Sequence, residues 1–561
     1  MLDTTLATEF IPGTNLKGNV VGANWTFLLP SLELDEIICL GAPQAAALAT
    51  LSRIGRDVAV LCEKAREVDQ VDEASRRRDL ANVRALSGKG GAALPFPDGQ
   101  ADLVLIADAR GARRLLSDHT WQAEIRRVLK PTGLVYFEPH GLDERALDGL
   151  GTPQFFWLTP RVGEAQTAVS LCDAETIGYF YRNSLYSPST HLRPLRRAEQ
   201  FLRKRNLFNG FFQRTGALVG GPEAGLDERP PRYLRSLAQT AGIDLDTYRW
   251  GMSARSRFNS RKVLFFLFDR SSSSPEYIVK LTRDSTFNAR LENECHALRF
   301  LHAQGLGARG ILPQVVFFGH HGRLAIVGET AIDGMPFRVR TRATVDCPYA
   351  RSAIDGLIDL GAATADRTAA SPLQVAEGLG VLFNRFAQLY QLAPAERDFL
   401  AEQIAMIAGS RTAFPLVFQH GDPGTWNVIV REDGQSVFLD WEAAEPKGMP
   451  LWDLFYFIRS FAMSVARASG KQDSLNVFAQ QFIAEATLSP LLVEATERYC
   501  DRSGVPKDLV APLFYSCWMH RALKETTRLT RAGLERGHYV NLLRLCIEHR
   551  NAPVFRSLFS S

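Results

Sequence analysis

Residues 418–454 read FQHGDPGTWNVIVREDGQSVFLDWEAAEPKGMPLWDL, and this stretch decides how the rest of the chain is interpreted. Two short apolar runs flank the dipeptide Asp433-Gly434, a pattern that predicts a β-hairpin preceded by a loop. Three polar residues of this stretch carry the argument. Asp422 lies in the loop, Asn427 follows after four intervening residues, and Asp440 lies at the end of the second strand. Phosphoryl transfer to a hydroxyl requires these residue types, because one carboxylate orients the hydroxyl while an asparagine and a second aspartate hold Mg²⁺.

The spacing from Asp422 to Asn427 matches the catalytic loop of protein kinases, with Gly421 in place of the arginine of that loop. A larger set of residues in the same order resembles the aminoglycoside phosphotransferase and choline kinase family: His420-Gly421-Asp422 with Asn427, Leu439-Asp440-Trp441-Glu442, Gly448, Pro450 and Asp453-Leu454. The resemblance implies an α+β, protein-kinase-like fold and phosphorylation of small-molecule hydroxyls.

The resemblance also assigns roles to these residues. It implies that Asp422 is the catalytic base and that Asn427 and Asp440 are the magnesium ligands. Asp453 would hold the catalytic loop in place. The alternative is a buried hairpin whose Asp and Asn residues only cap turns.

Composition sets limits on the class of protein. Hydrophobic residues make up 46% and charged residues 22% of the 561 residues, which is typical of a globular protein. The net charge of +4, from 65 basic and 61 acidic residues, is too small to indicate a nucleic-acid partner. The eight cysteines lie far apart without metal-ligand spacing, which indicates reduced thiols. The start MLDTTLATEF lacks the positive region of a signal peptide, and no apolar run is long enough to span a bilayer, so we expect a soluble cytoplasmic protein.

Strand and helix patterns alternate within residues 24–150. Apolar runs at 37–40, 58–61, 101–107 and 134–138 predict strands, and residues 45–51 and 121–129 predict helices. This alternation predicts a parallel, doubly wound α/β sheet, with any ligand at the carboxyl ends of the strands.

Two motifs in this region, LPFPDG followed by ADLVLIAD (94–108) and EIRRVLKPTGLVYFE (124–138), resemble class I methyltransferases that use S-adenosylmethionine. The resemblance implies that Gly41, after the first strand, and Glu63, after the second, contact this cofactor. The loop departs from the family pattern because Cys39 replaces an acid and Pro43 and Ala45 replace glycines. Proline removes a backbone donor and alanine adds a Cβ where close approach is needed. We therefore expect the fold, and we leave methyl transfer open, with Glu63 as an ordinary exposed acid as the alternative.

We predict three segments: a methyltransferase-like domain at 1–160, a basic helical connector and linker at 161–227, and a kinase domain at 228–561 with lobes at about 228–335 and 336–561. Basic and apolar residues interleave at 193–214. Such a helix can lie on an anionic membrane surface, or it can pack its apolar face on the first domain. Turn-forming residues at 219–231 predict the linker.

The kinase resemblance extends to residues that would hold ATP. Lys280 lies between Val279 and Leu281 in a predicted strand, so its side chain should point away from theirs. By resemblance, Lys280 binds the phosphates and pairs with Glu294 on the next helix. Ser253 and Ser256 lie in the loop that would cover the phosphates, for which a plain hairpin is the alternative. Glu329 marks the segment that would meet the adenine.

The acceptor is less well defined by the sequence. Histidine, arginine and lysine residues recur through 509–547, where this family lines its acceptor pocket, although these side chains could also lie on the surface. A basic pocket disfavours a polycationic aminoglycoside and favours an anionic or neutral acceptor. The fusion of a kinase with a methyltransferase-like domain favours a sugar or saccharide-containing acceptor. Two alternatives remain: a bifunctional kinase and methyltransferase acting on a glycan or natural product, and a scaffold without catalytic activity.

Overall fold

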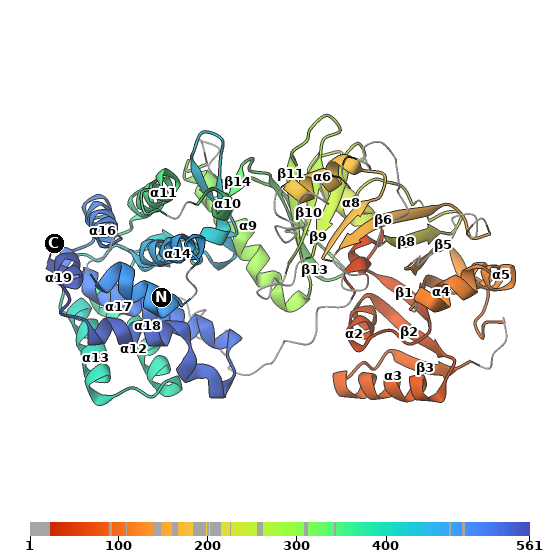
Figure 1. Ribbon diagram of the computed structural model, residues 1–561, viewed down its shortest axis with the longest axis horizontal. Helices are drawn as coiled ribbons and strands as arrows, with labels where there is room; N and C mark the ends of the chain where they lie inside the picture. The colour runs from red at the N-terminus through yellow and green to blue at the C-terminus, as the bar shows by residue number, and fades with distance from the viewer. Residues whose placement is uncertain are drawn as a thin grey trace. The chain divides into compact units, whose positions relative to one another are not determined.

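The computed structural model describes residues 23–560, except 89–92, 108, 139–146, 148, 160–165, 183–197, 199–200, 202–214, 225, 255–261, 308–311, 342–343, 471–472 and 485–487. The described residues form two compact units, each of which is treated by itself (Figure 1). The sheet unit groups the residues up to Leu291 with Val315–Ala331. The helical unit groups Glu292–Gln314 with the residues from Ile332 onward. The division therefore falls elsewhere than the limits predicted at residues 160 and 228.

One mixed sheet of 13 strands runs through the sheet unit. Its parallel part has the order β3 (Val83–Ser87), β2 (Gly55–Cys62), β1 (Leu34–Leu40), β4 (Ala101–Ile106) and β5 (Leu129–Phe137). Its antiparallel part continues as β8 (Thr215–Gly220), β6 (Pro153–Thr159), β7 (Thr167–Ser170), β9 (Arg249–Ser253), β10 (Lys262–Phe268), β11 (Tyr277–Thr282), β13 (Leu324–Thr330) and β12 (Val315–His321). The parallel part confirms the predicted α/β fold.

Helices cover both faces of the parallel part. They are α2 (Ala45–Ile54), α3 (Ala65–Arg78), α4 (Ala109–Leu116) and α5 (His119–Val128), and the sheet unit also contains α6 (Ala174–Arg182) and α8 (Arg232–Thr240). Successive residues of β1 point to opposite faces. Ile37 and Cys39 are buried in the cluster that includes α2, whereas Ile38 and Leu40 are buried in the cluster that includes α4 and α5. Two buried faces define a doubly wound sheet.

The parallel strands and the strands predicted for the first kinase lobe share one core. Strand β7 pairs with β9 in antiparallel register, with Ala168 opposite Met252. A single buried cluster extends from Leu103 of β4 to Phe265 of β10 and Ile326 of β13. The sheet unit therefore depends on residues from both predicted domains.

The predicted connector differs from the structure. Residues 161–227 contain β7, α6 and β8, and Val219 and Gly220 end a strand instead of starting a linker. The reason is that the apolar run ending at Val219 is buried between β5 and β6, where its backbone completes the ladder. The predicted amphipathic helix at 193–214 lies outside the described residues, apart from residues 198 and 201.

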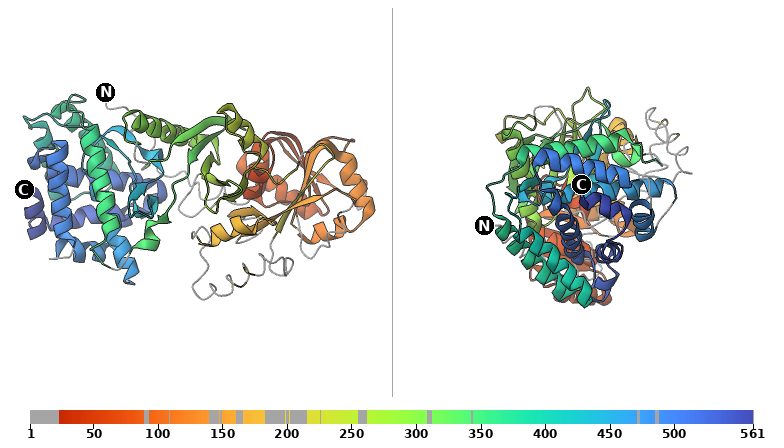
Figure 2. Two further views of the ribbon diagram at one scale, coloured as in Figure 1. Left: turned by 90° about the horizontal axis from the view of Figure 1, so that it is seen from above. Right: turned by 90° about the vertical axis from the view of Figure 1, so that its left-hand side faces the viewer.

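The helical unit contains the remaining helices and two small sheets (Figures 1 and 2). The helices are α9 (Asn288–Ala303, whose first turn belongs to the sheet unit), α10 (Phe337–Arg340), α11 (Pro348–Thr364), α12 (Pro372–Leu389), α13 (Pro394–Ala408), α14 (Trp452–Ala468), α15 (Ser474–Phe478), α16 (Ser489–Ser503), α17 (Val510–Glu525), α18 (His538–Glu548) and α19 (Pro553–Ser560). The small sheets are β14 (Met335–Pro336) with β16 (Val428–Val430) and β17 (Ser436–Phe438), and β15 (Val417–Gln419) with β18 (Glu445–Gly448). Helix α14 packs against α11, α16 and α17 and is buried along most of its length.

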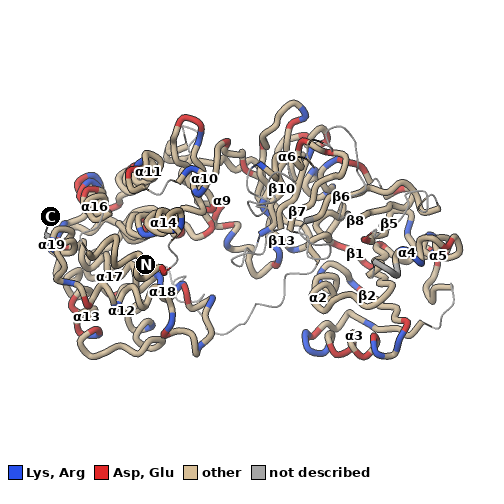
Figure 3. The backbone as a smooth tube through the Cα atoms, in the orientation of Figure 1, with Lys and Arg blue, Asp and Glu red and all other residues tan. Residues whose placement is uncertain are grey.

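Charged residues of both signs are interspersed along the exposed helices, as Figure 3 shows for α3 and α16. Arg498 and Arg502 of α16 pair with Asp355 and Asp359 of α11. No helix among the described residues combines the length and the apolar character needed to cross a bilayer.

The shared core yields a first prediction. A chain that starts at residue 228 should not fold cooperatively, because β9 loses its partner β7 and Trp250 loses the edge-on contact with Phe156, whose ring lies 6.0 Å away. Circular dichroism and thermal unfolding of the truncated and full chains test this. Cooperative unfolding of the truncated chain near the temperature of the full chain would contradict it.

Candidate active site

The predicted hairpin is present, and its register brings the predicted magnesium ligands together. Val428 of β16 lies opposite Phe438 of β17, and Leu439 donates its N–H to the carbonyl of Asn427 at 2.8 Å. Asp440 follows at once, with a φ of 68°, and caps the short 3₁₀ turn Trp441–Ala443. The chain therefore turns away directly after the strand, which leaves Asn427 and Asp440 at the same end of the hairpin.

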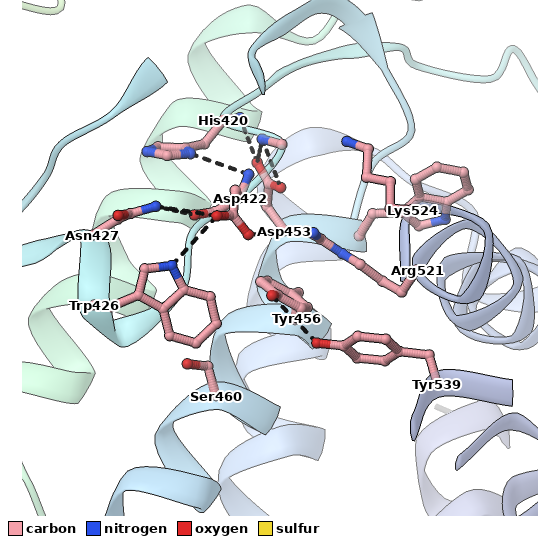
Figure 4. Close-up of polar contacts among 12 residues, drawn as sticks. His420, Asp422, Trp426, Asn427, Asp453, Tyr456, Ser460, Arg521, Lys524 and Tyr539 are labelled. Carbon is pink, nitrogen blue, oxygen red and sulfur yellow. Dashed lines mark hydrogen bonds and ion pairs between the residues drawn. The ribbon is translucent and has the colours of Figure 1, made fainter. Parts of the chain in front are cut away.

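Asp422 lies in the loop before this hairpin and is contacted from three sides (Figure 4). The Nδ2 of Asn427 donates to the Asp422 carbonyl at 2.9 Å and approaches its Oδ2 at 3.3 Å. Trp426 Nε1 lies 3.4 Å from Oδ2, and Arg521 Nη1 lies 3.5 Å from Oδ1. These contacts fix the direction of the carboxylate, which a general base requires.

Asp453, in the first turn of α14, anchors the same loop. It accepts the N–H of His420 at 2.6 Å and that of Gly421 at 3.2 Å. Burial raises the pKa of Asp453, while His420 and Arg521 oppose that rise. Gly421 has a φ of 78°, and a Cβ there would lie 1.9 Å from the carbonyl oxygen of Ala443. Only glycine therefore fits this turn.

His420 links the loop to the second hairpin strand. It is fully buried, its Nε2 lies 3.0 Å from the Leu439 carbonyl, and its Nδ1 accepts the Asp422 N–H at 3.3 Å. Because Nδ1 is the acceptor, Nε2 carries the proton in this arrangement. The ring also packs 4.4 Å from that of Trp441.

Glu294 of α9 makes a contact that the sequence did not predict. Its buried carboxylate accepts the N–H of Trp441 at 3.0 Å, and neighbouring Asn293 donates to the carbonyls of Glu442 and Ala444. This part of α9 therefore holds the turn that follows Asp440. Glu294 belongs to the helical unit, whereas Lys280, its predicted partner, belongs to the sheet unit.

Within the sheet unit, Lys280 of β11 is buried and pairs with Glu329 of β13, with Nζ 2.8 Å from Oε2. The neighbours Val279 and Leu281 belong to the hydrophobic core, which agrees with the predicted alternation. Glu329, at the segment predicted to meet the adenine, thus directs its side chain to Lys280. Ser253 is buried at the end of β9, and Ser256 lies outside the described residues.

The two predicted cofactor residues lie at the carboxyl end of the parallel strands, after β1 and after β2. Gly41 follows β1 with a φ of 88°, which suits a tight turn. The exposed Glu63, after β2, pairs with Arg114 of α4, which follows β4. Strands β2 and β4 flank β1 in the sheet, so this ion pair joins the two sides of the predicted cofactor loop. Cys39 is buried, and burial raises the pKa of its thiol, so it supplies no charge in place of the missing acid.

The sequence motifs predict no role for several residues that lie beside Asp422. Arg521 and Lys524 were recognised only as part of a basic segment, yet Arg521 is buried against Asp422 and its guanidinium lies 3.3 Å from the ring centroid of Tyr456. Trp426 sits inside the recognised motif and is 54% exposed. Its exposure next to a predicted base could not be read from sequence spacing, because an apolar residue in that position equally suits the core.

Residues 260–483 match the phosphotransferase enzyme family. This match confirms the phosphotransferase that the motifs of this part of the chain predicted, and the matched part follows the parallel strands of the α/β region. No curated protein matches the chain in sequence.

Solved structures resemble the chain at low identity. The bifunctional kinase-methyltransferase WbdD is 12% identical with a TM-score of 0.23, and the match covers 84% of both chains. An ethanolamine kinase from Plasmodium vivax is 14% identical with a TM-score of 0.34, over 56% of this chain and 84% of that one. The YcgJ protein from Bacillus subtilis is 23% identical with a TM-score of 0.18, over 21% of this chain and 47% of that one, so the chain spans less than half of YcgJ.

The anchoring of the loop yields a second prediction. Asp453→Ala leaves the buried N–H groups of His420 and Gly421 without their acceptor, so the free energy of unfolding should fall by about 2–4 kcal/mol. Urea unfolding measures this change, with the exposed Asp501→Ala on α16 as the matched control. An equal, small effect of both substitutions would show that Asp453 does not anchor the loop.

Proposed function

We propose that the chain is an ATP- and Mg²⁺-dependent kinase that phosphorylates a hydroxyl of a sugar or saccharide-containing small molecule. The observation that carries this proposal is the position of Asp422, held by Asn427 and Arg521 at the end of the hairpin that also presents Asp440. The match of residues 260–483 to phosphotransferases supports the reaction class. The saccharide is our inference from the fusion with a methyltransferase-like domain.

In the proposed step, the acceptor hydroxyl approaches Asp422 and its oxygen forms a bond to the γ-phosphorus of ATP. The bond from that phosphorus to the oxygen bridging to the β-phosphate breaks, ADP leaves, and the hydroxyl proton passes to the Asp422 carboxylate. Holding the carboxylate in one direction lowers the entropy lost on reaching the transition state. Lys280, fixed by Glu329, would bind phosphate oxygens of ATP.

The residues at the hairpin end fit a magnesium ion. Asn427 uses its Nδ2 for Asp422, which leaves its Oδ1 as the atom that can bind a metal. Asp440 adds a carboxylate oxygen, and hard cations such as Mg²⁺ prefer oxygen ligands. When bound, magnesium neutralises charge on the phosphate oxygens. No group of three or more His, Cys, Asp or Glu among the described residues could hold a metal alone, so the phosphates would complete the coordination.

A third prediction tests this assignment. Asp422→Asn should bind ATP with unchanged affinity and lose turnover by about a hundredfold to ten-thousandfold, since only the proton acceptor is removed. Asp440→Asn should instead lose magnesium-dependent ATP binding. Calorimetric titration with ATP, with and without Mg²⁺, and an ADP-release assay measure both effects.

If the wild-type chain neither binds nor hydrolyses ATP, the scaffold alternative replaces the kinase. An Asp422→Asn variant that turns over ATP and acceptor at the wild-type rate would refute the role of Asp422 alone.

We do not extend the proposal to methyl transfer, because the residues at the end of β1 do not fit S-adenosylmethionine. Pro43 and Ala45 occupy positions where glycine permits close approach, Cys39 is buried, and Glu63 is paired with Arg114.

The fourth prediction follows from this misfit. Calorimetric titration of the full chain with S-adenosylmethionine should give no binding at concentrations up to about a millimolar, the upper range of typical affinities for enzyme ligands. Arg114→Ala removes the ion-pair partner of Glu63 and is titrated in the same way as the matched variant. Tight binding by the wild-type chain that Glu63→Ala abolishes would establish the bifunctional alternative instead.

A further inference from the structure

Cationic side chains from two helices of the helical unit lie on the side of Asp422 that faces α14 and α17. Arg521 of α17 contacts Asp422 and stacks on Tyr456 of α14 (Figure 4). Lys524, one turn further along α17, lies 3.9 Å from Glu445, a long separation for an ion pair. Arg459, one turn after Tyr456 on α14, adds a third cation on the same helical face.

Arg459 differs from the other two because none of the described carboxylates pairs with it. Its guanidinium donates to Nε2 of His538 and lies 5.2 Å from the ring centroid of Tyr539, while its buried Nε has no hydrogen-bond partner among the described residues. Burial and the adjacent Arg459 lower the pKa of His538 to about 3, so the imidazole is neutral and does not balance the charge. A half-buried guanidinium without a counter-charge is costly to desolvate.

The acidic groups nearby already have partners. Asp453 accepts the loop N–H groups, Glu445 faces Lys524, and Glu525 accepts the N–H of Tyr539 at 3.1 Å. Asp422 itself is held by Arg521. None of these carboxylates forms an ion pair with Arg459 among the described residues, and an anionic ligand would supply the counter-charge.

Aromatic rings connect this arginine to the predicted base. The hydroxyls of Tyr539 and Tyr456 lie 3.3 Å apart, and the ring of Tyr456 meets that of Trp426 at 6.1 Å in an edge-on arrangement. Figure 4 shows Trp426 and Tyr456 lying on the same side of Asp422. An exposed indole beside tyrosine rings offers an apolar surface that suits a flat, partly polar molecule such as a sugar ring.

We propose that the acceptor is an anionic saccharide, whose carboxylate or phosphate group binds Arg459 and Arg521 while its ring packs on Trp426 and Tyr456. This inference rests on the proposed function, because it places the acceptor hydroxyl at Asp422. Arginine suits the role, since its planar guanidinium binds carboxylate and phosphate groups through paired hydrogen bonds.

The test is calorimetric titration of the full chain with three probes that share one ring: glucose, glucuronate and glucose 6-phosphate. The wild-type chain should bind at least one anionic probe about tenfold more tightly than glucose, as a charge-assisted contact of about 1.4 kcal/mol provides. Comparison of the two anionic probes distinguishes a carboxylate from a phosphate ligand. Arg459→Gln should reduce the preference to within about twofold, whereas Arg467→Gln, at an exposed position of the same helix, should preserve it.

Two results would overturn the inference. One is that neither anionic probe binds more tightly than glucose, including the case in which none of the three binds at millimolar concentration. The other is that Arg459→Gln keeps the full preference. Magnesium-dependent ATP binding, measured on the same preparations, distinguishes this failure from failure of the proposed kinase function.

Discussion

The geometry of the candidate active site depends on one buried carboxylate. Asp453, in the first turn of α14, accepts the N–H groups of His420 and Gly421, so the loop that carries Asp422 is held against a helix that is buried along most of its length. Without this acceptor, two buried donors would be unsatisfied. Ser460 of α14 makes a further contact with the Thr425 N–H at 2.9 Å. Because α14 also carries Tyr456 and Arg459, one helix fixes both the predicted base and the surface proposed for the acceptor.

In the sheet unit, the doubly wound parallel part is continuous with the antiparallel strands. Its antiparallel strands continue through the β7–β9 pair into the strands that carry Lys280 and Glu329. An unpaired β9 would expose a sheet edge, which invites aggregation. The α/β region therefore stabilises the strands proposed to bind ATP, through the β7–β9 pair and the shared core.

The sequence predicted local features well and distant ones poorly. The hairpin, with Asn427 and Asp440 at its end, follows from turn residues and strand alternation within a short segment. By contrast, the contact of Arg521 with Asp422 joins residues far apart in the chain, and only tertiary packing brings them together. The same holds for Arg459 and Tyr539, and for the β7–β9 pairing. The glycine and proline residues near Val219 predict a linker, whereas its short apolar run forms the end of β8.

The central claim is that this chain transfers a phosphoryl group to a saccharide hydroxyl. The most direct measurement incubates the full chain with ATP, Mg²⁺ and a panel of neutral and anionic saccharides, and follows products by phosphorus NMR and mass spectrometry. The account predicts a saccharide phosphomonoester that appears in step with ADP and disappears in Asp422→Asn. Consumption of ATP that yields only inorganic phosphate with every saccharide, or no consumption at all, would contradict it.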